Sequence, residues 1–158
     1  MRKVVVNTTP LIALAGIGKL ELLQLLYDEV MIPDAVLNEL ESEPARSLVL
    51  KADWIQKKTI THPERKDLFR ARLHSGEVEV MILAEEESAD LVIMDDNAAK
   101  KTAKFLGQNV TGPLGVLVKA KQRDLINEVS PLVQSLIDDG FYVDDKTKTM
   151  VLKSSGEI

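Results

Sequence analysis

The chain has 158 residues, no cysteine and a formal net charge of −5. This length favours one domain with a single core, and the lack of cysteine excludes disulfides, thiolate nucleophiles and cysteine-ligated zinc. Aromatic residues make up 4% of the chain, which argues against a platform of several aromatics that stack bases, and the acidic balance argues against a protein that coats nucleic acid non-specifically.

Short apolar runs alternate with longer helical patterns along the chain. Strands are predicted at residues 3–6, 29–32, 54–60, 91–94, 108–110 and 141–143. Helices are predicted at 10–17, 19–27, 34–42, 45–52, 65–73, 77–87, 98–106, 113–122 and 127–139, and the stretch 144–158 is expected to carry a terminal helix. This alternation predicts an α/β fold with a mainly parallel sheet covered on both faces.

The chain shows no Gly/Ser-rich linker, internal repeat or low-complexity tract. Residues 1–158 are therefore expected to form one domain, with 141–158 as its last strand and helix or as a C-terminal extension. No segment reaches the roughly 18 to 20 apolar residues of a membrane span, and the apolar run after Lys3 is too short for a signal peptide. A cytoplasmic location, with no membrane partner, is the expectation.

The first predicted strand, VVV, ends at Asn7, and the segment Thr8-Thr9-Pro10 leads into a helix. Ligands of α/β proteins bind outside the carboxyl ends of the strands, where chemistry would usually require an acid. A purely structural interpretation is that Asn7 caps the helix, although Thr8 or Thr9 would serve as well.

Two acids lie toward the buried faces of predicted helices. At 100° per residue, Glu39 projects about 60° from Val36 and so lies at the margin of the apolar stripe. Its structural interpretation is a side chain whose stem packs while its head reaches water. Glu77 lies on the stripe of the next acidic helix, whereas Glu79 lies nearly opposite and is expected to be solvated. Glu77 would also stabilise a helix N-terminus, which explains an acid there but not its inward direction.

Two adjacent acids, Asp95 and Asp96, follow the apolar strand LVIM. One of them is expected to be the N-cap of the next helix. The carboxyl ends of LVIM and VVV point to the same sheet edge, which predicts one cleft containing Asn7, Glu39, Glu77, Asp95 and Asp96. Carboxylates packed together repel unless a cation shares the site. With only two histidines in the chain, oxygen ligands for Mg²⁺ or Mn²⁺ are expected, and such ions can hydrolyse phosphodiesters.

Basic residues gather in three places, which are Arg65, Lys66, Arg70 and Arg72; Lys100, Lys101 and Lys104; and Lys119, Lys121 and Arg123. The second group follows the two aspartates on the same helix. Lys100 and Lys104, one turn apart, are candidates for binding phosphate near the metal. The alternative is a solvated helix face.

Five motifs, VVVNTTPLIAL, VMIPDAVLNELE, HSGEVEVMILA, LVIMDDNAAKKTA and VTGPLGVLVKAK, are followed by LIDDGFYV and cover most of the chain. In this order they resemble the PIN-domain family, specifically a prokaryotic branch of predicted nucleic-acid-binding proteins related to VapC-type toxins. The most specific part is GE-x-E followed by the aspartate pair.

The resemblance implies a three-layer α/β/α sandwich with an acidic pocket that binds Mg²⁺ or Mn²⁺ and hydrolyses RNA. It assigns Glu39 to the second family motif, Glu77 to the third, and Asp95 and Asp96 to the fourth, as catalytic and metal-binding residues. Thr8, Lys100 and Lys104 are the predicted substrate contacts. Many relatives are homodimers, and many are toxins that a cognate antitoxin holds inactive, so both kinds of partner are expected here.

The first motif departs from the family pattern, which has Asp followed by Thr or Ser, as in DTSPL. Asn7 occupies the position of that aspartate, which is normally a central metal ligand. Its carbonyl oxygen can still ligate magnesium, but one negative charge is lost. At an effective dielectric of about 20, a charge at about 4 Å changes the interaction by roughly 4 kcal/mol before compensation.

The substitution is compatible with an engineered change, with a natural weak nuclease and with a non-catalytic descendant. Two functions therefore stay open. One is a metal-dependent ribonuclease, and the other is an inactive PIN module that binds RNA or a protein partner. A nucleotide-binding Rossmann module is discounted, because no G-x-G-x-x-G follows the first strand.

Overall fold

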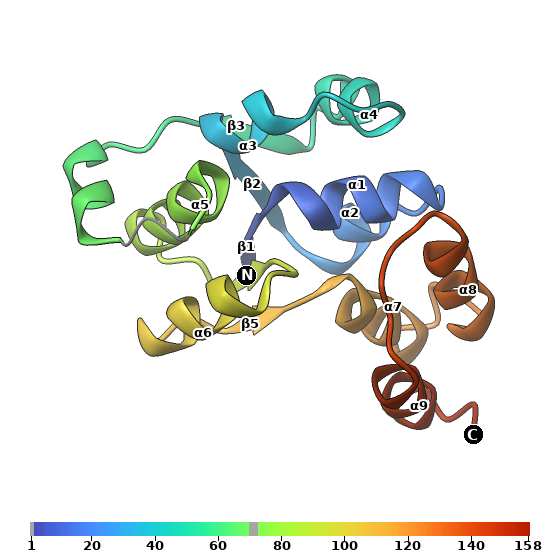
Figure 1. The fold of residues 1–158 in the computed structure, drawn as a ribbon. Coiled ribbons are helices and arrows are strands. Elements are labelled where there is room, and N and C mark those ends of the chain that lie inside the picture. Colours follow the sequence, from blue (N-terminus) through green and yellow to red (C-terminus); the bar gives the residue numbers. More distant parts are fainter. Residues whose placement is uncertain (1, 70–72) are drawn as a thin grey trace.

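The computed structural model describes residues 2–69 and 73–158 and has a five-stranded sheet at its centre (Figure 1). The strands are β1 (Lys3–Val6), β2 (Glu29–Pro33), β3 (Ile55–Lys58), β4 (Leu91–Ile93) and β5 (Val110–Thr111). Their order is β3-β2-β1-β4-β5, and every neighbouring pair is parallel. The predicted parallel sheet is therefore confirmed.

Helices cover both faces of the sheet. They are α1 (Thr8–Gly16), α2 (Leu22–Leu26), α3 (Asp34–Glu39), α4 (Ala45–Lys51), the 3₁₀ helix η1 (Pro63–Leu68), α5 (Ser75–Glu86), α6 (Asn97–Phe105), α7 (Pro113–Gln122), α8 (Ser130–Asp138) and α9 (Asp145–Ser154). Figure 1 shows α5 and α6 on one side of the sheet and α1, α2 and α7 on the other. This arrangement is the α/β/α sandwich that the sequence predicted.

The core is aliphatic, as the low aromatic content required. The three valines of β1 are fully buried, as expected for a parallel strand covered on both faces. Helix α5 packs across β1, β2 and β4 and also contacts α3 and η1. As a result, every α5 residue from Gly76 to Ala84 is buried.

This environment contradicts the expectation that Glu79 is solvated. Its side chain is 9% exposed and lies 2.7 Å from the Lys66 ammonium. The carboxylate also accepts a hydrogen bond of 3.1 Å from the Ala35 N–H. A helical wheel defines a solvated face only for a helix covered on one side, and α5 is covered on several.

Three predicted elements differ in the structure. Residues 141–143 form no strand but part of an extended link between α8 and α9, in which Phe141 and Val143 pack on the core. The predicted helix 65–73 is replaced by η1, and residues 70–72, with the basic candidates Arg70 and Arg72, lie outside the described residues. The helix predicted at 34–42 already ends at Glu39, whereas the expected terminal helix is present as α9.

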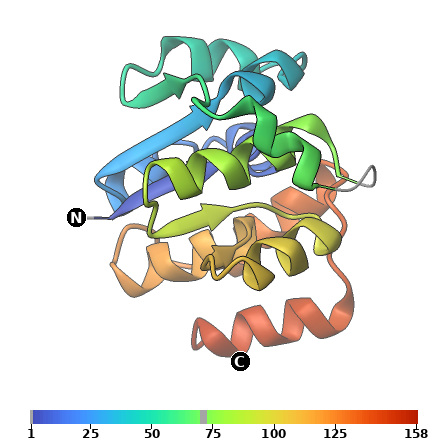
Figure 2. The same ribbon diagram turned by 90° about the vertical axis from the view of Figure 1, so that its left-hand side faces the viewer.

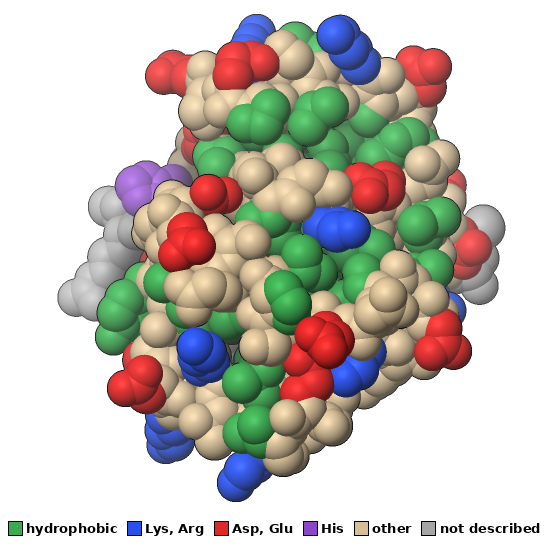
Figure 3. All heavy atoms as spheres, turned by 90° about the vertical axis from the view of Figure 1, so that its right-hand side faces the viewer, with side chains coloured by type: hydrophobic (Ala, Val, Ile, Leu, Met, Phe, Trp, Pro, Cys, Tyr) green, Lys and Arg blue, Asp and Glu red, His purple; other side chains and the backbone are tan. Residues whose placement is uncertain are grey.

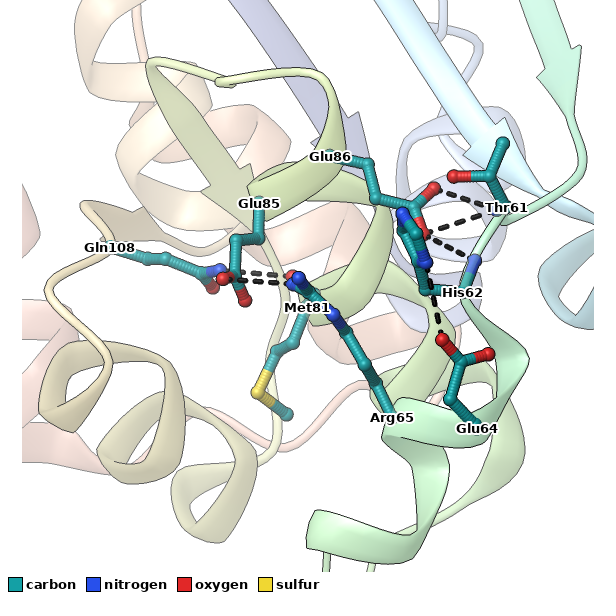
Figure 4. Close-up of polar contacts among 8 residues, drawn as sticks. All are labelled: Thr61, His62, Glu64, Arg65, Met81, Glu85, Glu86 and Gln108. Atoms are coloured by element: carbon teal, nitrogen blue, oxygen red, sulfur yellow. Dashed lines mark hydrogen bonds and ion pairs between the residues drawn. The ribbon is translucent and has the colours of Figure 1, made fainter.

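Hydrogen bonds and an ion pair hold the segment that leads from β3 into η1 against the C-terminal half of α5 (Figure 4). Glu86 accepts hydrogen bonds of 2.8 Å from the Thr61 N–H and 2.9 Å from the His62 N–H. Arg65 pairs with Glu85 at 2.9 Å. These contacts set the approach of η1 to α5, at whose other end the candidate site lies. No described helix is long and apolar enough to cross a membrane.

Candidate active site

Asn7 follows β1 directly and lies at the carboxyl edge of the sheet. Its backbone N–H donates to the Ile93 carbonyl of β4 at 2.8 Å. Its side chain is 5% exposed, and the Oδ1 atom is buried with no hydrogen-bond partner among the described residues. Asn7 is the N-cap of α1 by position, yet its side chain makes no capping hydrogen bond. The structural interpretation of Asn7 as a helix cap is therefore wrong.

Glu39, the last residue of α3, is held at the same edge by two donors. Thr8 Oγ1 donates to Glu39 Oε2 at 2.8 Å, and the Gly76 N–H of α5 donates to Glu39 Oε1 at 2.8 Å. The residue is exposed, as its position at the margin of the apolar stripe predicted. Its carboxylate joins α1, α3 and α5 at one point.

Gly76 was not predicted as a site residue. A Cβ atom there would lie 2.9 Å from the Glu39 carboxyl carbon, so a larger residue would displace this carboxylate from its present position beside the backbone. The signal in the sequence is a glycine in the first turn of a helix, where it is otherwise unfavourable. Direct contact with Glu39 could not be read from that signal alone.

Glu77 faces inward, as predicted, and is 5% exposed. It also takes part in a capping box, since its Oε1 accepts from the His74 N–H at 2.9 Å. Burial raises the pKa of the Glu77 carboxyl; the His74 N–H opposes this rise, and the charges of Asp96 and Glu39 add to it. Glu77, Asp96 and Glu39 therefore share one electrostatic environment.

Asp95 and Asp96 separate into two roles. Asp96 is the expected N-cap of α6 and accepts from the Ala99 N–H at 2.9 Å. Asp95 is half-buried, and no hydrogen bond to its carboxylate is found within the described residues. Burial raises the pKa of Asp95, the Lys100 ammonium lowers it and the charge of Asp96 raises it. Asp95 is thus the member of the pair that capping does not engage.

The two candidate phosphate ligands differ in position. Lys100 is half-buried, and its Nζ would lie 3.1 Å from a Cβ built on Gly112. It lines one cavity together with Asp95. We use the name acidic edge for Asn7, Glu39, Glu77, Asp95 and Asp96 together. Lys104 is exposed further along α6, and no hydrogen bond or ion pair among the described residues connects it to the acidic edge. Figure 3 shows a different face from that of α6, the right-hand side of Figure 1, where Lys and Arg side chains are scattered among Asp and Glu.

The donors at this edge suit a hard divalent cation by their chemistry, because all are carboxylate or carbonyl oxygens. The unpartnered Asn7 Oδ1 adds a buried oxygen that lacks a donor. In residues 2–69 and 73–158, no three acidic or histidine side chains are close enough to hold an ion jointly. Mg²⁺ is often bound through only one or two carboxylates and keeps several waters, so the donor set fits such an ion.

Comparison with known proteins agrees with this arrangement. A family model described as a PIN domain matches residues 3–157. No match was found among curated proteins. The matched range includes the whole sheet, all the helices named above and every residue of the acidic edge, and so the chain belongs to the PIN-domain family.

Proposed function

We propose that this PIN domain is a Mg²⁺- or Mn²⁺-dependent ribonuclease whose activity is weakened by Asn7. The observation that carries the proposal is the buried, unpartnered Oδ1 of Asn7 at the carboxyl edge of the sheet. An unsatisfied buried acceptor costs about 1–3 kcal/mol of folding free energy. The Asn7 side chain does not recover this cost by capping α1, since it makes no capping hydrogen bond. A ligand that accepts its lone pair would offset this cost.

Residues adjacent to Asn7 in the sequence and in the sheet link this oxygen to the acids. Thr8, the next residue, donates to Glu39, and Ile93, which accepts the Asn7 N–H, precedes Asp95 by two residues. We propose that Asn7 and one or two of the acids Glu39, Glu77 and Asp95 ligate the cation, with waters completing its coordination, and that Asp96 contributes mainly its charge because it caps α6. When bound, the cation would activate water and stabilise the leaving oxygen of a phosphodiester.

The protein residues have separate tasks in this proposal. Thr8 and Gly76 hold the Glu39 carboxylate in place through their two hydrogen bonds. Asp95, whose carboxylate is not used for capping, is available to ligate the cation. Lys100, beside Asp95, holds a phosphate of the substrate through its ammonium group.

A second candidate function is an inactive PIN module that binds RNA or a protein partner. Asn7 itself favours this alternative, because the usual acid of the first motif is missing. Three of the four carboxylates also accept hydrogen bonds from backbone N–H groups, which are Gly76 for Glu39, His74 for Glu77 and Ala99 for Asp96. Such contacts stabilise the acidic edge without a cation.

Membership of the PIN-domain family does not by itself specify the partners of this chain. RNA as the substrate, a role as the toxin of a toxin–antitoxin pair and a homodimer are all expected from the resemblance to VapC-type proteins. They stay predictions, and the RNA prediction is the one that the experiment below addresses.

The test is a three-way cleavage assay on a mixed RNA pool with Mn²⁺, using EDTA as the control. The wild-type chain should cleave weakly, Asn7→Asp should cleave faster, and Asp95→Asn should be inactive. Restoring the charge supplies the missing ligand, whereas Asp95→Asn removes one. If none of the three proteins cleaves while RNA or a partner still binds, the ribonuclease proposal fails and the binding module replaces it.

A further inference from the structure

A cavity of about 360 Å³ opens beside the acidic edge, between the first turns of α6 and α7 and the link that joins α8 to α9. Its volume lies at the lower end of the roughly 300–1,000 Å³ of small-molecule sites. Asp95 and Lys100 line it on the side of the acids, and Tyr142 and Asp144 line it on the side of the link. In Figure 2 the link runs on the side to which the strand arrows point.

Tyr142 is the unusual residue of this cavity. Its neighbours Phe141 and Val143 pack on the core, whereas Tyr142 is 84% exposed. An extended segment alternates its side chains between two sides, so anchoring Phe141 and Val143 directs Tyr142 outward. The link thus presents one aromatic ring at the carboxyl edge of the sheet.

The charges of the cavity limit what it can bind. Asp95 and Asp144 contribute carboxylates against the single ammonium of Lys100. The Thr147 N–H, which donates to Asp144 at 2.7 Å, lowers the pKa of that carboxyl and keeps it ionised. An anion inside this cavity would be repelled, whereas a neutral, flat ring with N–H donors would find acceptors and an aromatic face.

Lys100 lies at the boundary between the cavity and the acidic edge. Its Nζ is close to Gly112, where any side chain would crowd it. At this position the ammonium can bind a phosphate while the attached base lies in the cavity. Nucleotides combine these two features, a flat neutral base and an anionic phosphate.

We propose that this cavity binds one nucleobase of a single-stranded nucleic acid, stacked on Tyr142, with a phosphate of the same strand at Lys100. The inference rests on the proposed function, since it makes the cavity part of the substrate site of the ribonuclease. A base in a duplex is already stacked between its neighbours, so recognition by stacking selects single strands. One aromatic suffices for one base.

The test measures binding in EDTA, so that cleavage does not interfere. A fluorescently labelled single-stranded RNA hexamer and an abasic strand of equal length and charge are titrated with each protein. Tyr142→Ala should weaken binding of the RNA by about tenfold or more, the scale of stacking one base. Tyr142→Phe, which keeps the ring, should bind almost as the wild type does. The abasic strand should bind the wild type and Tyr142→Ala equally.

The control variant is Phe105→Ala, which removes another exposed aromatic at the far end of α6 and should change neither affinity. Equal losses for RNA and the abasic strand, unchanged affinity in Tyr142→Ala, or a wild type that does not bind RNA would each overturn the base site. Cleavage by Asn7→Asp with no effect of Tyr142→Ala refutes the base site alone. Binding that depends on Tyr142, in a chain that never cleaves, refutes the ribonuclease alone.

Discussion

At the scale of single residues, the acidic edge is arranged around a polar atom that the protein itself leaves unpaired. Asn7 Oδ1 is buried without a donor among the described residues, while the carboxylates of Glu39, Glu77 and Asp96 each accept at least one hydrogen bond. An aspartate at this position would add a charge beside Glu39, Glu77 and Asp95. Without a cation, that charge raises the repulsion within the edge.

This repulsion gives a prediction that does not depend on activity. In EDTA, Asn7→Asp should unfold at a lower temperature than the wild type, because a buried carboxylate replaces a neutral amide. Millimolar Mn²⁺ should raise the midpoint of Asn7→Asp by more than that of the wild type, since ligands that bind the folded state stabilise it. Differential scanning fluorimetry measures both.

The matched control for this experiment is Asn127→Asp, the same substitution at an exposed position before α8. Its midpoint should respond to Mn²⁺ as the wild type does. An equal response of Asn7→Asp and Asn127→Asp would show that Asn7 does not belong to a cation site.

Residue types and their spacing were enough to nominate Asn7 and the four acids as candidate site residues, but not to predict which hydrogen bonds hold them. The contacts of Glu39 with Thr8 and Gly76 join positions 31 and 37 residues apart. A single sequence contains no direct record of such pairs. The different roles of Asp95 and Asp96 could be predicted only in part. The sequence indicated that one of them is the N-cap of the next helix, but not which one.

At the scale of secondary-structure elements, α5 shows how tertiary packing overrides a helical wheel. The periodicity correctly turned Glu77 inward, but it assigned Glu79 to solvent. Elements that precede α5 by many residues, α3 and η1, cover that side of it. Glu79 then serves as the contact among three elements, since it joins the Ala35 N–H of α3 and the Lys66 ammonium of η1.

Removing this contact should be costly. Glu79→Ala leaves the buried Ala35 N–H without its acceptor, and an unsatisfied buried donor costs about 1–3 kcal/mol. Urea unfolding should show a decrease of this size in the free energy of unfolding. The matched control is Glu85→Ala, which removes another glutamate of α5 that pairs with η1 but whose side chain is 60% exposed.

The Arg65–Glu85 pair is an exposed ion pair, and such pairs contribute about 0–1 kcal/mol. Glu85→Ala should therefore change the unfolding free energy much less than Glu79→Ala. If the two variants lose equal stability, Glu79 acts only as a surface charge and its role in joining α3, α5 and η1 is refuted.

At the scale of the whole molecule, the alternation of strands and helices was sufficient to predict the layers and the parallel sheet. The predicted strand at 141–143 failed for a physical reason. Its alternating pattern is real, because Phe141 and Val143 face the core, but alternation does not supply a neighbouring strand with which to pair. The order of the strands likewise depends on long-range pairing.

A carboxylate that follows the last helix, that of Glu157, connects the C-terminal end of α9 to the loop before α8. Glu157 accepts hydrogen bonds of 2.7 Å and 2.9 Å from the Val129 and Ser130 N–H groups and lies 3.0 Å from the Lys121 ammonium. The Val129 N–H, helped by the Ser130 N–H and by Lys121, lowers the pKa of Glu157 to about 2. The ordinary value of this carboxyl is 4.5.

A carboxyl whose pKa is lower in the folded chain stabilises it above the unfolded pKa, and this stabilisation is lost as the pH falls through the folded value. The contribution of Glu157 should therefore be complete above about pH 4.5 and disappear toward pH 2. Glu157→Gln should be less stable than the wild type at pH 7, and the difference between their urea midpoints should shrink at pH 4 and again at pH 3. Glu128→Gln, at an exposed position in the neighbouring loop, should show no such convergence. If the urea midpoints of the wild type and Glu157→Gln differ by the same amount at every pH, the charge of Glu157 contributes nothing to stability. Glu157 would then act only through its shape and through hydrogen bonds that do not need the charge.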